Sequence, residues 1–300
     1  MTKSSTYRLL MLLLFFISAE QTFSQTENVR SYPMSEKALL WQIEGPTVKN
    51  KCYLFGTMHI IPSESFFFPK KLEKAITKSE RLVMEIGNLP DQTELLGLLT
   101  LEDETLNDFL DKLQMDSLKI WVKSNMGFEG EIFNSIIATM KPVAIVQMAT
   151  QLKFGDDLSS YELSLQDIAL ENNQEIQGLE TVEKQLSLFD DLSKNDQADL
   201  IMDAIRDDER SQLINNELLE KYMAQDIDGL YHLVTKNNDV IMRQQTVFLN
   251  DRNLDWIPKI KFMLSEKKTF IAVGAGHLGG PQGVIRLLEK EGYTLTPIKL

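Results

Sequence analysis

Two short segments near opposite ends of the chain share one pattern, and this pattern constrains the fold more than any other feature. In CYLFGTMH an apolar run ends at Gly56, and His59 follows three residues later. In FIAVGAGH a second apolar run ends at Gly274, and His277 follows at the same offset. A short apolar run that ends at glycine is typical of a buried β-strand followed by a sharp turn. The pattern therefore predicts two strands that each end in a Gly-x-x-His (GxxH) loop.

The segments that follow the two GxxH loops also correspond to each other. Residues 69–79 and 281–292 both begin with proline and are predicted helices, and the second ends at a glycine. Apolar runs at residues 81–87 and 293–300 then predict a strand after each helix. Two copies of strand–GxxH–helix–strand indicate an internal repeat. We expect an α/β fold, a single domain whose central β-sheet takes strands from both ends of the chain.

The chain between the two repeats is mostly helical. Helical patterns occur near residues 95–101, 105–113, 117–124, 131–152, 164–173, 182–192, 197–222, 227–236 and 240–266. One predicted strand, at residues 175–180, interrupts them, and two more at 38–45 and 51–56 flank a Gly-Pro turn. Because no low-complexity linker separates these segments, we expect one domain over residues 35–300 with a large helical insertion.

The N-terminal residues have the pattern of a secretory signal peptide. Lys3 and Arg8 give a basic start, residues 9–19 are apolar, and Thr22 and Ser24 occupy the small-residue positions of a cleavage site. The apolar stretch is shorter than the roughly 18 residues that a membrane span needs, so we favour cleavage after residue 24 over an uncleaved anchor. The sequence therefore predicts an exported protein, periplasmic or extracellular, with no stable span in the mature chain.

Charge and cysteine content exclude several classes of protein. The net charge is −13 at pH 7, and no basic stripe offsets it. Such a chain is repelled by nucleic acid and by anionic membranes, so we expect no nucleic-acid partner. The single cysteine, Cys52, cannot form an intramolecular disulfide and lies in an apolar strand pattern, where we expect it to be buried.

The two histidine loops are the strongest candidates for chemistry. In open α/β sheets, ligands bind beyond the carboxyl ends of the strands, where His59 and His277 are expected. Glu85 ends a third predicted strand, so parallel strands would bring all three side chains together. Two imidazoles and a carboxylate suit Zn²⁺, Mn²⁺, Co²⁺ or Fe²⁺, and such an ion can activate water. The same groups could act without metal in acid–base catalysis, and each histidine alone could be a simple turn residue.

Several segments together resemble the TraB/PrgY/GumN family, which includes the Tiki-type metalloproteases. They are YLFGTMH, VMEIG, IQGLETVEKQ, NDRNLDWI and FIAVGAGHLGGPQGVIRLLEKEGYTLTPI, and they extend from about Trp41 to Ile298. The resemblance implies a single α/β domain in which the two GxxH loops face each other across a site. It assigns His59 and His277 as the motif histidines and Glu85 as the acidic residue after the first repeat.

The same resemblance implies two further site residues. Arg252 would donate to an anion or oxyanion, a role that suits a fixed and permanently charged guanidinium. Without the family, a surface ion pair with Asp251 or Asp255 is an equal alternative. Glu180 is a shared motif residue, for which we predict the role of a partner that orients a histidine. Its alternative is a carboxylate that stabilises the following helix.

These residues favour a metal-dependent hydrolase that acts on a peptide or protein substrate. Mn, Co or Zn would be held by His59, His277 and Glu85, with Glu85 or Glu180 carrying the proton and Arg252 stabilising the oxyanion. The chain has no HExxH motif, so it is not a zincin. Two alternatives stay open, a non-catalytic peptide-binding protein and a metal-free esterase. Ring nitrogens more than about 8 Å apart would rule out a shared ion.

Two other features have less specific interpretations. His232 lies among apolar residues of a predicted helix, and we interpret it as structural. The aromatic run SFFFP, residues 65–69, follows His59 closely. It could line a substrate pocket, but we favour a place in the core.

Overall fold

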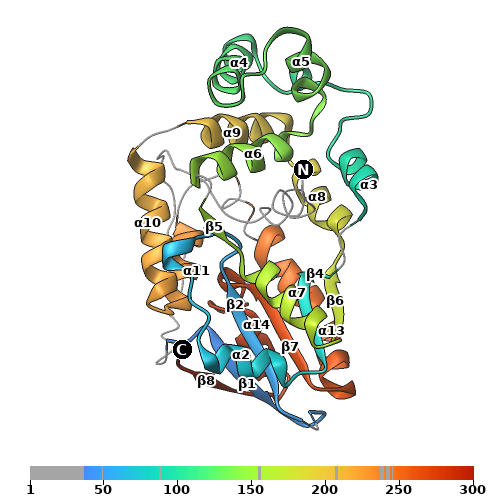
Figure 1. The fold of residues 1–300 in the computed structure, drawn as a ribbon, viewed down its shortest axis with the longest axis vertical. Coiled ribbons are helices and arrows are strands. Elements are labelled where there is room, and N and C mark those ends of the chain that lie inside the picture. The colour runs from blue at the N-terminus through green and yellow to red at the C-terminus, as the bar shows by residue number, and fades with distance from the viewer. Residues whose placement is uncertain are drawn as a thin grey trace. The chain divides into compact units, whose positions relative to one another are not determined.

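The computed structural model describes residues 37–48, 50–87, 90–154, 157–206, 209–236, 240, 244 and 246–300 (Figure 1). The predicted signal peptide, residues 1–24, lies outside these described residues. Within them, no helix combines the length and apolar character that crossing a bilayer requires. The chain clusters into a sheet-containing unit and a helical unit, and each is presented separately below.

The sheet-containing unit is built around six strands in the order β6-β4-β7-β2-β1-β8. The strands are β1 Leu40–Glu44, β2 Cys52–Thr57, β4 Arg81–Ile86, β6 Glu175–Glu180, β7 Thr269–Gly274 and β8 Thr294–Ile298. β6, β4, β7 and β2 are parallel, whereas β1 is antiparallel to both β2 and β8. The predicted α/β fold and the central sheet with strands from both chain ends are therefore confirmed.

The central strands are apolar because both of their faces are buried. All six residues of β7 are buried, and five of the six in β2 are. A parallel strand covered on both faces has no solvent side, so its sequence is a continuous apolar run. At the sheet edge, β8 instead alternates: Leu295 is buried, and the threonines on either side of it are exposed. This strand also contains Pro297, which an edge strand tolerates better than a central one.

Helices cover both faces of this sheet. The helices that lie wholly or mostly in this unit are α2 Lys70–Thr77, α7 Tyr161–Glu171, α10 Glu209–Met223, α11 Ile227–Lys236, α13 Arg252–Glu266 and α14 Val284–Lys290. The connections β2–α2–β4 and β7–α14–β8 run in opposite directions across the sheet. Because such crossovers are almost always right-handed, α2 and α14 lie on opposite faces. α2 packs beside α7, and α13 packs beside α14 (Figure 1).

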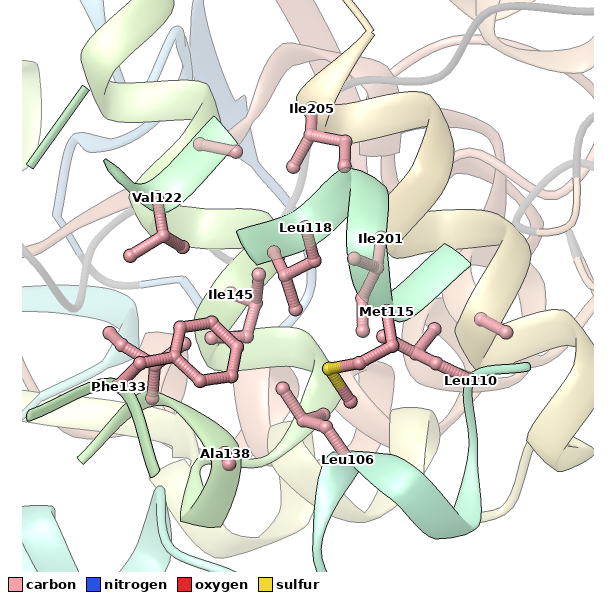
Figure 2. Close-up of a cluster of buried hydrophobic side chains, with 13 residues drawn as sticks. Leu106, Leu110, Met115, Leu118, Val122, Phe133, Ala138, Ile145, Ile201 and Ile205 are labelled. Atoms are coloured by element: carbon pink, nitrogen blue, oxygen red, sulfur yellow. The ribbon is translucent and has the colours of Figure 1, made fainter. Parts of the chain in front are cut away.

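The helical unit has its own hydrophobic core (Figure 2). Its helices are α3 Gln92–Leu98, α4 Lys112–Met126, α5 Gly130–Ser135, α6 Pro142–Phe154, α8 Val182–Asp190 and α9 Lys194–Ile205. Met115, Leu118 and Val122 form the buried stripe of α4 and pack with Ile145 of α6 and Ile201 of α9. The predicted helical insertion is confirmed, and its apolar stripes bury one another.

One predicted helix of this unit, residues 131–152, is wrong as a single element. The chain instead forms α5, a 3-10 turn at Ile137–Thr139, and then α6. The second helix begins at Pro142, because proline lacks the N–H that a helix interior needs but fits the first helical position.

Two other long predicted helices also correspond to more than one element in the structure. The predicted helix at 197–222 consists of α9, which begins after the capping Ser193, and a separate α10. In the predicted helix at 240–266, α13 begins only at Arg252, and a π-helical turn, Thr246–Asp251, precedes it. Helical periodicity continues across these breaks, which is why the sequence pattern did not mark them.

Candidate functional site

Four of the five predicted site residues lie at or just beyond the carboxyl end of a parallel strand, and the fifth, Arg252, begins α13. Glu85 is the fifth residue of β4, and Glu180 is the last residue of β6. His59 follows β2 by two residues, and His277 ends the short 3-10 helix η5, Ala275–His277, which directly follows β7. Because the four strands are parallel neighbours, their carboxyl ends meet at one edge of the sheet.

Gly274 marks the place where three of these side chains meet. A Cβ atom on Gly274 would lie 3.2 Å from His59 Nε2, 3.3 Å from Glu85 Oε1 and 3.7 Å from His277 Cδ2. The Nε2 atoms of both histidines lie 3.9 Å from Glu85 Oε1. They therefore cannot be further apart than twice that distance, which is within the limit for a shared ion. The absence of a side chain at Gly274 keeps this common space open.

The glycine of the first GxxH motif has a different role. A Cβ atom on Gly56 would lie 3.1 Å from Ala275 Cα and 3.0 Å from Leu278 Cδ2. The carbonyl oxygen of Gly56 accepts a hydrogen bond from the buried Tyr222 hydroxyl at 3.1 Å. Gly56 thus lets η5 pack directly on β2, which brings His277 beside the first loop.

The glycines after His277 also have a packing role. Gly280 has a φ of +77°, a conformation that favours glycine, and the Tyr231 ring of α11 occupies the place where its side chain would be. Its N–H donates to Asp228 Oδ1 at 3.3 Å. These contacts hold the loop that carries His277 against α11.

Arg252 is the central cation of the site, and its side chain is 1% exposed. Its Nε donates to Glu180 Oε1 at 2.7 Å, and Nη2 donates to the same oxygen. Nη2 also donates to Glu85 Oε2 at 2.6 Å. Nη1 donates to the carbonyl oxygen of Phe248 at 3.1 Å and to His277 Nε2 at 3.2 Å. All five N–H groups of the guanidinium are thus engaged.

Glu85 is held as a carboxylate. Burial alone would raise its pKa, but the charge of Arg252, with smaller contributions from the two histidines, lowers the pKa to about 2. Its Oε1 also accepts the backbone N–H of Gly274 at 2.8 Å. Glu85 is therefore ionised at neutral pH and directs negative charge at the common space.

The imidazole of His277 is buried and neutral. Burial is the main cause that lowers its pKa to about 3; Arg252 lowers it further, and Glu85 opposes this only in part. Its Nδ1 lies 2.7 Å from Asn253 Oδ1, and its ring packs on Trp256 with 4.5 Å between ring centroids. The first two turns of α13 thus supply three of its partners, Arg252, Asn253 and Trp256.

His59 has different surroundings, and its side chain, at 11%, is more exposed than those of Arg252, Glu85, Glu180 and His277. Its Nδ1 lies 2.7 Å from Glu162 Oε1, near the start of α7. Glu162 also accepts from Thr57 Oγ1 at 2.5 Å and from Ser160 Oγ at 3.1 Å. Burial would lower the pKa of His59, but the charge and hydrogen bond of Glu162 outweigh it and raise the pKa to about 9.

The partners of the two histidines differ from the predicted ones. Glu180 is predicted to orient a histidine, but in the structure it binds Arg252. Glu162 and Asn253 contact the histidines instead, and neither was predicted from the sequence. Glu162 is 103 positions from His59, so no local pattern connects them. Asn253 directly follows Arg252 in NDRN, and that adjacency was a usable signal.

Arg252, His232 and the aromatic run after His59 also differ in how they relate to the site. The surface ion pair proposed for Arg252 is wrong, because its side chain is buried. His232 lies exposed on α11 and is not among the residues that converge at Gly274. Phe66 and Phe68 pack on the buried Tyr161, with ring centroids 4.7 and 6.4 Å away, which agrees with a place at the margin of the core.

Comparison with known proteins assigns the chain to a family. A sequence model of the TraB/PrgY/gumN family matches residues 39–297, which is most of the chain. The chain belongs to this family. It is also similar to an uncharacterised protein of Treponema pallidum (strain Nichols), with 22% identity over 281 residues that cover 85% of this chain and 81% of the relative. No solved structure gives a significant match.

The site of this TraB/PrgY/gumN chain has donor types that suit a divalent metal ion. Two imidazole nitrogens and a carboxylate oxygen are ordinary ligands, and spacings of 3.9 Å are close to the roughly 3–4 Å between ligands of one ion. Both Nδ1 atoms already contact side-chain oxygens, which leaves Nε2 for a metal.

These side chains are not positioned to coordinate an ion in the present arrangement. Among the described residues, no group of three or more His, Cys, Asp or Glu side chains is placed to hold a metal. Arg252 Nη1 donates to His277 Nε2, the atom that a metal would use. A metal at His277 Nε2 would therefore have to displace this guanidinium N–H from the ring.

Proposed function

We propose that this TraB/PrgY/gumN protein is a metal-dependent hydrolase that cleaves peptide bonds. The observation that carries the proposal is the convergence of His59 Nε2, His277 Nε2 and Glu85 Oε1 on the space beside Gly274. Mn²⁺, Co²⁺ or Zn²⁺ held by these three side chains would supply an activated water and polarise a substrate carbonyl.

The neighbouring residues would orient the ligands. Glu162 and Asn253 each contact an Nδ1 atom, so both rings present Nε2 to the common space. Such partners fix the ring orientation and thus reduce the reorganisation that binding requires.

Arg252 would act on the developing oxyanion. Its longest hydrogen bond is the 3.2 Å contact from Nη1 to His277 Nε2. When the lone pair of His277 is used by another partner, this N–H is released beside the common space. It can then donate to a negatively charged oxygen, while Glu85 and Glu180 keep the guanidinium in place.

Neither acidic residue is well suited to carry the proton. The pKa of Glu85 is about 2, so this carboxylate holds a proton poorly at neutral pH. Glu180 accepts from both Nε and Nη2 of Arg252. We therefore propose that both carboxylates hold Arg252 in place and supply negative charge to the site, in contrast to the proton-transfer role that the sequence suggests.

Metal content and thermal shift of the mature protein with Mn²⁺, Co²⁺ or Zn²⁺ test this proposal. We expect about one bound ion per chain in the wild type and its loss in His59→Ala and His277→Ala. His232→Ala is the matched control, because it removes an exposed histidine outside the site. Peptide cleavage should then require the same ion. A wild type with neither a bound ion nor metal-dependent cleavage would overturn the proposal, and peptide binding that survives both site substitutions would favour a non-catalytic binder.

A metal-free hydrolase is the second candidate, and one observation favours it. Without metal, the pKa of His59 is about 9 and that of His277 is about 3, so one ring is an acid and the other a neutral acceptor. Groups with separated pKa values can act as an acid–base pair. This candidate predicts cleavage that resists strong chelators but is lost when either histidine is replaced.

Export is part of the proposal as well. The basic start and the apolar residues 9–19 support a signal peptide, and a peptidase outside the cytoplasm would meet peptide substrates there. Cell fractionation with the full chain tests this, together with N-terminal sequencing of the exported product. Cleavage after residue 24 is expected, and retention of residues 1–24 on a membrane would favour the anchor.

A further inference from the structure

Asn253 makes three polar contacts around His277. Its Oδ1 lies 2.7 Å from His277 Nδ1. Its Nδ2 donates to the carbonyl oxygen of Gln282 at 2.8 Å and to that of His277 at 3.4 Å. The residue is 2% exposed, so its polar atoms depend on these protein contacts for hydrogen bonding.

The two carbonyl contacts determine which way the amide faces. Only the NH₂ group can donate to carbonyl oxygens, so Nδ2 must face Gln282 and the backbone of His277. The amide oxygen of Asn253 therefore faces the ring. Because that oxygen only accepts, Nδ1 of His277 must carry the proton.

Arg252 leads to the same conclusion from the other side of the ring. Its guanidinium has donors only, and Nη1 lies 3.2 Å from His277 Nε2. Nε2 must therefore hold a lone pair. In the opposite tautomer, an N–H at Nε2 would face the N–H of Arg252, and Nδ1 would face the amide of Asn253 without a proton.

We propose that Asn253 is a positioning residue that holds His277 in the tautomer with its proton on Nδ1, and so directs the Nε2 lone pair at the space beside Gly274. The inference deepens the proposed function and rests on it for its catalytic meaning. The tautomer itself, however, is a property of the resting protein and can be measured without metal or substrate.

Nuclear magnetic resonance of the ring nitrogens tests the tautomer directly. The chain has three histidines, so protein labelled with ¹⁵N-histidine gives few signals, and His232→Gln and His277→Gln assign them. In metal-free wild type we expect His277 to be protonated on Nδ1 and unprotonated on Nε2. A wild-type ring protonated on Nε2 would overturn the proposal, and this measurement decides even if a variant at Asn253 fails to fold.

Asn253→Leu tests whether this residue is the cause. We expect the Nε2–H tautomer of His277 to become populated beside the Nδ1–H form, because Arg252 alone then favours Nδ1–H. Gln174→Leu is the matched control, because Gln174 also donates to two backbone carbonyls, those of Ile76 and Ser79, each at 2.7 Å. The control should leave the His277 signals unchanged, and an unchanged tautomer in Asn253→Leu would contradict the proposal.

Cobalt affinity separates this inference from the proposed function. Loss of a residue that orients a metal ligand typically lowers metal affinity by about 10- to 100-fold, so Asn253→Leu should bind Co²⁺ that much more weakly than Gln174→Leu. Equal affinities would overturn the positioning role. If the wild type binds no Co²⁺, the metal-dependent function fails, while the tautomer measurement still decides whether Asn253 sets the proton on His277.

Discussion

The two GxxH loops share a backbone pattern but have different surroundings. His59 has the carboxylate of Glu162 at its Nδ1, whereas His277 has the neutral amide of Asn253. Arg252 lies against the other nitrogen of His277. The pKa is raised to about 9 in His59 and lowered to about 3 in His277. The same local motif therefore gives a cation in one loop and a neutral base in the other.

The two histidines differ in pKa because their charged neighbours differ, and not because one ring is buried and the other is not. Burial lowers the pKa of both rings. In His59 the charge of Glu162 outweighs it, whereas in His277 Arg252 adds to it. A GxxH loop thus places an imidazole at the edge of the sheet, and the helix packed against that loop sets its charge.

Of the substitutions considered, removal of Arg252 should have the largest effect on stability and on the pKa difference between His59 and His277. Arg252→Met leaves Glu85 and Glu180 buried without their cation, and breaking a buried ion pair in this way costs about 3–5 kcal/mol of unfolding free energy. The pKa of His277 should also rise, because Arg252 lowers it. Urea unfolding at pH 7 measures the first effect, and ring-nitrogen resonance measures the second.

Arg286→Met provides the control for that substitution. Arg286 pairs with Glu289 at 2.7 Å, but its side chain is 33% exposed. We expect a loss below about 1 kcal/mol, as for other ion pairs near the surface. Similar losses for the two arginines would show that the buried carboxylates do not depend on Arg252.

Glu162→Gln should make the two histidines more alike. It removes the charge that raises the pKa of His59 but leaves an amide oxygen for Nδ1. A histidine whose folded pKa is about 9 stabilises the fold fully below its unfolded value of 6.5, and this stability is lost as the pH rises through about 9. The variant should lose on the order of 1–3 kcal/mol at pH 7. Its stability should also depend much less on pH between 6.5 and 9.

Urea unfolding from pH 6 to 10 measures this effect. Glu44→Gln, an exposed carboxylate at the end of β1, is the control and should keep the wild-type alkaline profile. An unchanged profile in Glu162→Gln would mean that Glu162 does not set the charge of His59.

Much of the fold follows from the sequence for a physical reason. The run FIAVG forms β7 because a strand covered on both faces must be apolar throughout, and such runs stand out from amphipathic helices. Helix ends were harder to predict. Pro142 marks the start of α6, but the apolar spacing of α5 and α6 continues across it, so periodicity alone joined the two.

Apart from Arg252, which only the family resemblance implied, the site was predictable where it depends on strand ends. His59, Glu85 and His277 follow from the rule that parallel strands share a carboxyl edge, and the structure brings them together at Gly274. Glu162 was not predictable, because it reaches His59 only after a long helical insertion returns the chain to the sheet. Partners of this kind depend on tertiary packing, which leaves no local sequence pattern.

The two motif glycines should respond differently to the same substitution. Gly56→Ala places a methyl group 3.1 Å from the backbone of Ala275, which cannot yield easily, and should cost about 1–3 kcal/mol. In Gly274→Ala the nearest atoms are the ends of the His59 and Glu85 side chains. It should cost less stability but weaken Co²⁺ binding. Urea unfolding and Co²⁺ titration of both variants test this, and the reverse order of effects would contradict it.

The smallest change in the charge-dependent part of the stability at neutral pH should come from His277→Gln, because His277 is mostly neutral there in both folded and unfolded chains. Its folded pKa of about 3 lies below the unfolded value of 6.5, so only the unfolded chain takes up a proton between them. Wild-type stability should therefore fall as the pH drops below 6.5, by on the order of 1 kcal/mol per pH unit.

The range from pH 6.5 to 4.5 isolates the contribution of His277 to the free energy of unfolding. Glu85 has an unfolded pKa of 4.5, so its own contribution changes only below that pH. In His277→Gln the decline over this range should be shallower, whereas His232→Gln, at an exposed position, should keep the wild-type slope. Urea unfolding at several pH values in this range measures both slopes. Equal slopes in wild type and His277→Gln would mean that His277 accepts a proton in the folded state, as His59 does, and the contrast between the two loops would then be lost.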